Sequence, residues 1–159
     1  MAAPKYLSIY LNDQLALGVA WREVAKRAAR ENPGDERIAR VAIEIAEDVI
    51  TFESIMDQLG VKKSRLKKTG AVVGERFGRL KLNGHVTSYS PLSRFVELDF
   101  LAMGIEGKKI LWANLRDLAQ IPGVDFDALI ERAQAQREEL EPSRLAAGEA
   151  LRLDRANER

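Results

Sequence analysis

Residues 35–59 read DERIARVAIEIAEDVITFESIMDQL. The apolar side chains of this stretch recur every three or four positions, which predicts an amphipathic helix with one apolar stripe. Asp35 is placed to cap the start of this helix, and Gly60 is placed to end it. The stripe consists of Ile38, Val41, Ala42, Ile45, Val49, Phe52, Met56 and Leu59.

The same periodicity extends along the chain in both directions. Helices are predicted over residues 5–31, 35–59, 66–81, 91–119 and 125–152. The turn Asn32-Pro33-Gly34 separates the first two, and Pro122-Gly123 separates the last two, so each pair should be antiparallel neighbours. No stretch alternates with period two, so no sheet is expected. The sequence predicts an all-α four-helix bundle with one long crossover containing a short extra helix, in a single domain over residues 1–159.

Composition excludes several classes of protein. The chain has 159 residues, of which 46% are hydrophobic and 31% are charged. No apolar run approaches the roughly 18 residues of a bilayer span. The absence of Cys excludes disulfides and thiolate sites, and the single His85 excludes a site with two histidines from one chain. The first residues lack the apolar core of a signal peptide, so a cytoplasmic location is expected.

A short motif in the first helix resembles a known family. Residues 11–15 read LNDQL, which is similar to the opening of the first helix in bacterioferritin-type proteins. With the predicted helix order, the chain resembles the ferritin-like superfamily, and most of all small bundle proteins of actinobacterial type with no assigned function. This resemblance implies the bundle fold. In the di-iron members, two helices each supply a carboxylate and the other two each supply an ExxH motif.

The chain departs from that ligand pattern. By the resemblance, the first-helix ligand falls on Gly18, which has no side chain. The second-helix ExxH falls on Glu44-Ile45-Ala46-Glu47, with Glu in place of His. The helix over 125–152 has no ExxH. We therefore expect the fold without the usual oxidase chemistry, and a non-catalytic role is favoured over an enzymatic one.

Charged residues interrupt the apolar stripes predicted for the last two helices. Asp99 and Glu106 lie two turns apart on a stripe with Phe95, Met103 and Ile110. Arg137 and Arg144 lie two turns apart on a stripe with Phe126, Leu129, Ala133, Leu140 and Ala147. In a hairpin that turns near residue 122, Asp99 is level with Arg144, and Glu106 with Arg137. Because a buried unpaired charge costs several kcal/mol, these residues are predicted to form core ion pairs where ferritin-like relatives bind metal.

Two other interpretations of these charges stay open. The arginines can reach outward to solvent from the edge of their stripe. Alternatively, the carboxylates can form a di-metal site that binds Fe or Mn and supports an oxidase. Its ligands would be Glu44, Asp48, Asp99 and Glu106. Without that site, no cofactor is expected.

The middle of the chain is strongly basic. Residues 61–82 contain eight basic side chains and one acid. The basic residues are Lys62, Lys63, Arg65, Lys67, Lys68, Arg76, Arg79 and Lys81. Such a cluster can bind phosphates, so nucleic acid or an anionic membrane is a possible class of partner. This class is nevertheless the least favoured one. Phe77 is the only aromatic residue between positions 53 and 88, and no nucleic-acid-binding motif is present.

A second apolar strip on the 35–59 helix points to association. It consists of Ala39, Ile43, Ala46 and Ile50. A helix on the outside of a monomeric bundle needs only one apolar stripe, so the strip should be covered by the 66–81 helix or by a second subunit. The leading hypothesis is thus a non-catalytic ferritin-like bundle that acts by association with itself, as a homodimer, or with an unidentified protein partner.

Overall fold

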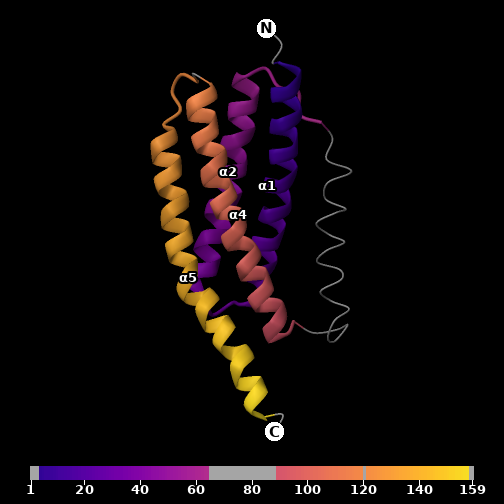
Figure 1. Cartoon of the computed structure of the whole chain (residues 1–159), viewed down its shortest axis with the longest axis vertical. Coiled ribbons are helices and arrows are strands. Elements are labelled where there is room, and N and C mark those ends of the chain that lie inside the picture. The colour runs from indigo at the N-terminus through magenta and orange to yellow at the C-terminus, as the bar shows by residue number, and fades with distance from the viewer. Residues whose placement is uncertain (1–3, 65–88, 120, 158–159) are drawn as a thin grey trace.

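The computed structural model describes residues 4–64, 89–119 and 121–157, with side chains up to Arg152, and these residues form four α-helices and no strand. The helices are α1 (Lys5–Glu31), α2 (Glu36–Gln58), α4 (Pro91–Leu118) and α5 (Phe126–Asn157) (Figure 1). The all-α four-helix architecture is therefore confirmed. The helix predicted over 66–81 lies outside the described residues. None of the four described helices combines the length and the apolar character that a bilayer span requires.

The helix ends follow the signals in the sequence. At the start of α2, the side chain of Asp35 accepts a hydrogen bond from the backbone N–H of Ile38 at 3.4 Å. At the start of α4, Ser90 accepts one from the backbone N–H of Ser93 at 3.1 Å. Gly60, just after α2, has a φ of 68°, a left-handed conformation that side chains other than glycine rarely adopt.

The four helices pack in an arrangement in which neighbours are antiparallel. One apolar cluster joins the end of α1, the start of α2, the start of α4 and the end of α5. A second cluster joins the start of α1, the end of α2, the end of α4 and the start of α5. Consequently α2 and α4 run in the same direction, and the chain between them links opposite ends of the bundle (Figure 1).

Core-facing residues alternate at spacings of three and four, as in coiled coils. On α2 these are Ile38, Val41, Ile45, Asp48, Phe52 and Ile55. On α4 they are Leu98, Leu101, Ile105, Lys108, Trp112 and Leu115, and on α5 they are Ala133, Gln136, Leu140, Ser143 and Ala147.

The stripe predicted for α4 is therefore wrong, since Met103 and Ile110 are 59% and 62% exposed. Helix α4 has apolar residues on more than one face, and packing selects the other one.

Helix α5 is longer than predicted. It continues beyond residue 152 to Asn157, because the last stretch contains neither Gly nor Pro to end it. It also contains Pro142, which has no N–H to donate to the carbonyl of Glu138. Figure 1 shows that the C-terminal part of α5 turns away from the line of its first part, as expected for a helix with an internal proline.

Candidate functional site

A layer of polar residues lies in the core where the two apolar clusters meet. Asp48 on α2 and Gln136 on α5 are buried, and the side chain of Lys108 on α4 is only 14% exposed. Each of these residues occupies a position of the three-and-four spacing that is otherwise apolar. Three different helices thus place a hydrogen-bonding group in the same layer of the bundle.

The three side chains are bonded to one another. Nζ of Lys108 donates to Oδ2 of Asp48 and to Oε1 of Gln136. Nε2 of Gln136 donates to Oδ2 of Asp48 at 2.9 Å. At the edge of the layer, Nε of Arg132 lies 3.4 Å from Oδ1 of Asp48, and the same guanidinium also pairs with Glu47. Two cations and two carboxylates therefore balance within the cluster.

Burial lowers the pKa of Lys108, and the charge of Asp48 opposes this shift. A desolvated lysine is the kind of amine that enzymes use as a nucleophile. Here, however, Nζ donates to Asp48 and Gln136, so it holds its protons and has no lone pair with which to attack. The arrangement is suited to fixing the register of the helices.

The structure contains both ion pairs that the hairpin register predicts. Nη1 of Arg144 lies 2.9 Å from Oδ1 of Asp99, and Nε of Arg137 lies 3.8 Å from Oε1 of Glu106. Glu141 pairs with both arginines, and their hydrogen bonds lower the pKa of Glu141 to about 2. The register of α4 against α5 is thus the expected one.

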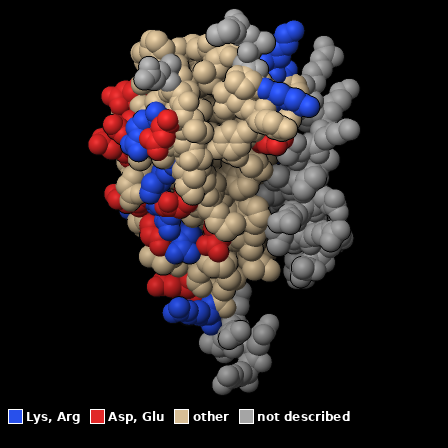
Figure 2. Space-filling view, turned by 45° about the horizontal axis from the view of Figure 1, so that its top comes forward, with Lys and Arg blue, Asp and Glu red and all other residues tan. Residues whose placement is uncertain are grey.

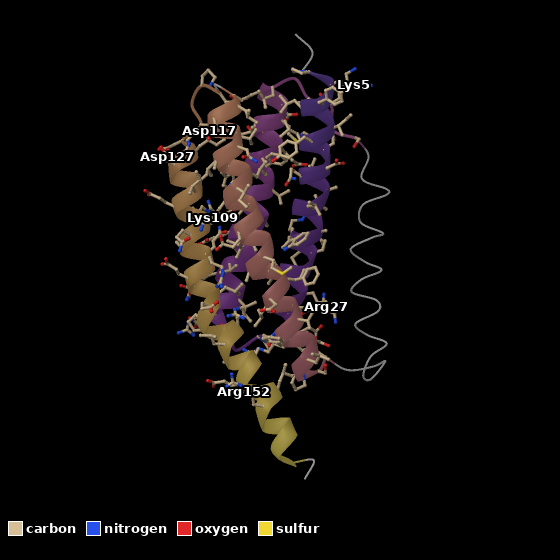
Figure 3. The ribbon with its side chains drawn as sticks, viewed as in Figure 1. Lys5, Arg27, Lys109, Asp117, Asp127 and Arg152 are labelled. Carbon is tan, nitrogen blue, oxygen red and sulfur yellow. The ribbon has the colours of Figure 1, made fainter. Side chains whose placement is uncertain are left out.

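The predicted core location of these pairs is wrong. The side chains of Asp99 and Glu106 are 43% and 49% exposed. Figure 2 shows charged side chains gathered in a band along the α4–α5 edge, and Figure 3 places Lys109, an ion-pair partner of Glu106, on the side of α4 towards α5. The pairs are peripheral because the apolar face of α4 that meets the core is the one through Leu101 and Ile105.

The carboxylates of the predicted metal site do not come together. Asp48 is held in the polar layer by Lys108, whereas Asp99 and Glu106 lie on the α4–α5 edge with their arginines. In the described part of the chain, no group of three or more Asp, Glu, His or Cys side chains is arranged to hold a metal ion. The set of Glu44, Asp48, Asp99 and Glu106 is therefore corrected: α4 turns two of its members away from the core.

Most of the basic segment lies outside the described residues. Lys62 is exposed, and Nζ of Lys63 lies 3.0 Å from Oδ2 of Asp57 at the end of α2. The other six predicted residues lie outside the described residues: Arg65, Lys67, Lys68, Arg76, Arg79 and Lys81. The interpretation of this segment as a phosphate-binding surface stays a prediction.

Glu97 on α4 is a second buried carboxyl, and its role was not predicted. Its Oε1 lies 3.0 Å from Nε of Arg27 on α1, and its Oε2 has no hydrogen-bond partner among the described residues. Burial raises the pKa of Glu97, and Tyr89 and Arg27 oppose this shift. The available signal was its spacing of four from Leu101, which places it on the buried face.

Replacing Glu97 with Gln is expected to raise stability at neutral pH. Because the pKa of Glu97 is higher in the folded state than in the unfolded state, wild-type stability falls as pH rises from the unfolded value, about 4.3, through the folded one. Glu97→Gln removes this titration and keeps an acceptor for Arg27. Urea unfolding of both proteins between pH 4 and 8 should therefore show a difference that grows with pH. A difference that does not change with pH would contradict the raised pKa.

Comparison with known proteins provides no relative from which a role could be transferred. No family model matches the chain, and no curated protein and no solved structure matches it. The function is therefore inferred from the polar layer, the exposed apolar residues and the cavities of the bundle.

Proposed function

We propose that the chain is a non-catalytic, ferritin-like helical bundle that acts by association with a second copy of itself through the outer face of α2. The observation that carries this proposal is the exposure of Ile43 and Ile50, which are 62% and 65% exposed and lie two turns apart on one face. Ala39 on the same face is also exposed, and Ala46 between the two isoleucines is half-buried. A pair of large aliphatic residues on one exposed strip is typical of an association surface.

The helix arrangement supports the ferritin-like part of the proposal. Parallel α2 and α4, joined by one long crossover, are the connectivity of ferritin-like bundles. In the di-iron members, carboxylates in the core bind metal ions, whereas here the core carboxylate of Asp48 binds the ammonium of Lys108. The positive charge is supplied by the chain itself, which favours a structural layer over a redox centre.

The strip on α2 is compatible with a two-fold axis. If two α2 helices cross antiparallel with the axis near Ala46, Ile43 of one copy is level with Ile50 of the other. The same register sets Arg40 against Glu53. The small side chain of Ala46 at the centre allows a close approach. Four isoleucines give at most roughly 6–12 kcal/mol of transfer free energy, against about 4–15 kcal/mol of association cost, so a reversible dimer is expected.

Sedimentation velocity tests this proposal. The wild type should sediment as a dimer at concentrations on the order of 100 μM, and the Ile43→Glu, Ile50→Glu variant should be a folded monomer, because charges are costly in an apolar contact. The matched control is Met103→Glu, Ile110→Glu on α4, whose targets have the same spacing and similar exposure. The control should remain dimeric. A monomeric wild type, or a dimer broken only by the α4 variant, would refute the α2 interface.

A further inference from the structure

A cavity of about 170 Å³ lies between α1, α2 and α4, beside the polar layer. An apolar cavity of about 150 Å³ in a helical protein is large enough to hold a benzene molecule. The cavity therefore has room for one aromatic ring with a small substituent. This observation is independent of the apolar strip on α2.

Glycines create this space. Gly18 on α1 and Gly104 and Gly107 on α4 all line the cavity and leave it without side chains from three helical positions. A Cβ on Gly18 would lie 3.6 Å from Cγ2 of Val49, an ordinary contact, so the backbone does not require glycine there. Trp21 packs over Gly104 and donates Nε1–H to the carbonyl of Phe100 at 2.6 Å. That bond fixes the indole as one wall of the cavity.

The rest of the lining is mainly aliphatic and aromatic. Buried walls are formed by Leu15, Val49, Phe52, Leu111 and Trp112. Leu17, Met103 and Gly107 also line the cavity and are exposed, so the cavity opens to solvent between α1 and α4. Figure 2 shows that the charged band along the α4–α5 edge leaves the surface over α4 and α1 largely uncharged. An apolar molecule can therefore approach the opening without displacing ion pairs.

Trp112 and Lys108 line the cavity and carry hydrogen-bond donors. Nε1 of Trp112 is buried and has no partner among the described residues, which is costly for an indole N–H. Nζ of Lys108 uses two of its three N–H bonds on Asp48 and Gln136. A guest with one acceptor would satisfy a donor that the protein leaves open. Because Lys108 and Arg132 are balanced by Asp48 and Glu47, the guest should carry no charge of its own.

From the volume, the lining and the open donors, we infer that the cavity is a binding site for a small neutral aromatic molecule with one hydrogen-bond acceptor, such as an aryl ketone. The ring occupies the space over Gly18, and the acceptor is directed to the donors at the polar layer. This class of ligand differs from a simple hydrocarbon by its acceptor and from an aromatic acid by its lack of charge.

Calorimetric titration of the full chain with acetophenone tests the site. Binding is expected with a dissociation constant on the order of 100 μM, as for a ligand of this size in a preformed cavity. Isopropylbenzene has the same shape without the acceptor and should bind at least tenfold more weakly. Benzoate adds a charge and should bind at least tenfold more weakly than acetophenone. Absence of acetophenone binding at millimolar concentration, or binding of all three with equal affinity, would overturn the inference.

Variants locate the site. Gly18→Leu fills the cavity and should reduce acetophenone affinity more than tenfold, whereas Ala146→Leu on the exposed face of α5 is the matched control and should leave it unchanged. Trp112→Phe removes the indole N–H and should weaken acetophenone binding several-fold without weakening isopropylbenzene binding. If Gly18→Leu does not fold, Gly107→Leu at the opening replaces it. Undiminished acetophenone binding by either folded leucine variant would place the ligand elsewhere.

Discussion

Replacing Lys108 with Met is expected to lower the free energy of unfolding by about 3–5 kcal/mol, which is the usual cost of removing one partner from a buried ion pair. The reason is that the carboxylate of Asp48 stays buried after its ammonium partner is removed. Gln136 still donates to this carboxylate, and Arg132 still lies 3.4 Å from it, so the loss should fall near the lower end of that range. Urea unfolding followed by circular dichroism measures it.

The neighbouring lysine provides the control. Lys109 has the same side chain on the same helix and pairs with Glu106 at 3.1 Å, but this pair lies at the α4–α5 edge, where Glu106 is about half exposed. Lys109→Met should therefore cost at most about 1 kcal/mol, as for other surface ion pairs. Equal losses for the two lysines would show that the Lys108 pair is not desolvated in solution.

An apolar version of the layer tests whether the polar layer itself stabilises the fold. The triple variant Asp48→Leu, Lys108→Met, Gln136→Leu removes the three bonded groups together, so no buried charge is left alone. Replacing a buried polar cluster with apolar residues is often neutral or stabilising by about 1–4 kcal/mol. The triple variant should be at least as stable as the wild type. A triple variant less stable than the wild type would mean that the layer itself stabilises the fold.

The helices were predictable because their signals are local. Apolar spacing and the breaks at Pro33-Gly34 and Pro122-Gly123 require no knowledge of the tertiary structure. The hairpin register was also predictable, since a short turn fixes which residues of α4 and α5 are level. This register correctly predicted the pairing of Arg137 with Glu106 and of Arg144 with Asp99. The burial of those pairs depends on which face of α4 meets the core. The face of α4 that is buried depends on how the other three helices pack against it, so the apolar pattern of α4 alone does not determine it.

The polar layer was only partly visible in the sequence for the same reason. Asp48 stands out as a charge within an apolar stripe, but its partner Lys108 lies on a helix joined to α2 by the long crossover. No short turn fixes the relative height of α2 and α4, so the sequence does not predict that Asp48 and Lys108 are level. The usable signal was the unbroken spacing of Leu101, Ile105 and Trp112, in which Lys108 fills the expected apolar position.

The two glycines on α4 that line the cavity are expected to respond in opposite directions to the same substitution. Helix propensity alone predicts that alanine at either position stabilises the helix by about 1 kcal/mol. This should hold for Gly107→Ala, because no described atom lies within 4 Å of the Cβ position. At Gly104 the Cβ would fall 1.7 Å from Nε1 and 1.8 Å from Cδ1 of Trp21. The indole must then move, and its bond to the carbonyl of Phe100 is lost.

Gly104→Ala should consequently destabilise the protein by about 1–3 kcal/mol, as for other overpacked positions, and shift the Trp21 fluorescence towards that of a solvated indole. The clash can be isolated by repeating the substitution in a Trp21→Ala background, where no ring stands in the way. There Gly104→Ala should become neutral or stabilising, giving a coupling free energy of at least about 1 kcal/mol between the two sites. Equal stabilisation by Gly104→Ala and Gly107→Ala in the wild-type background would instead show that Trp21 does not pack against α4, and with it that the cavity lacks this wall.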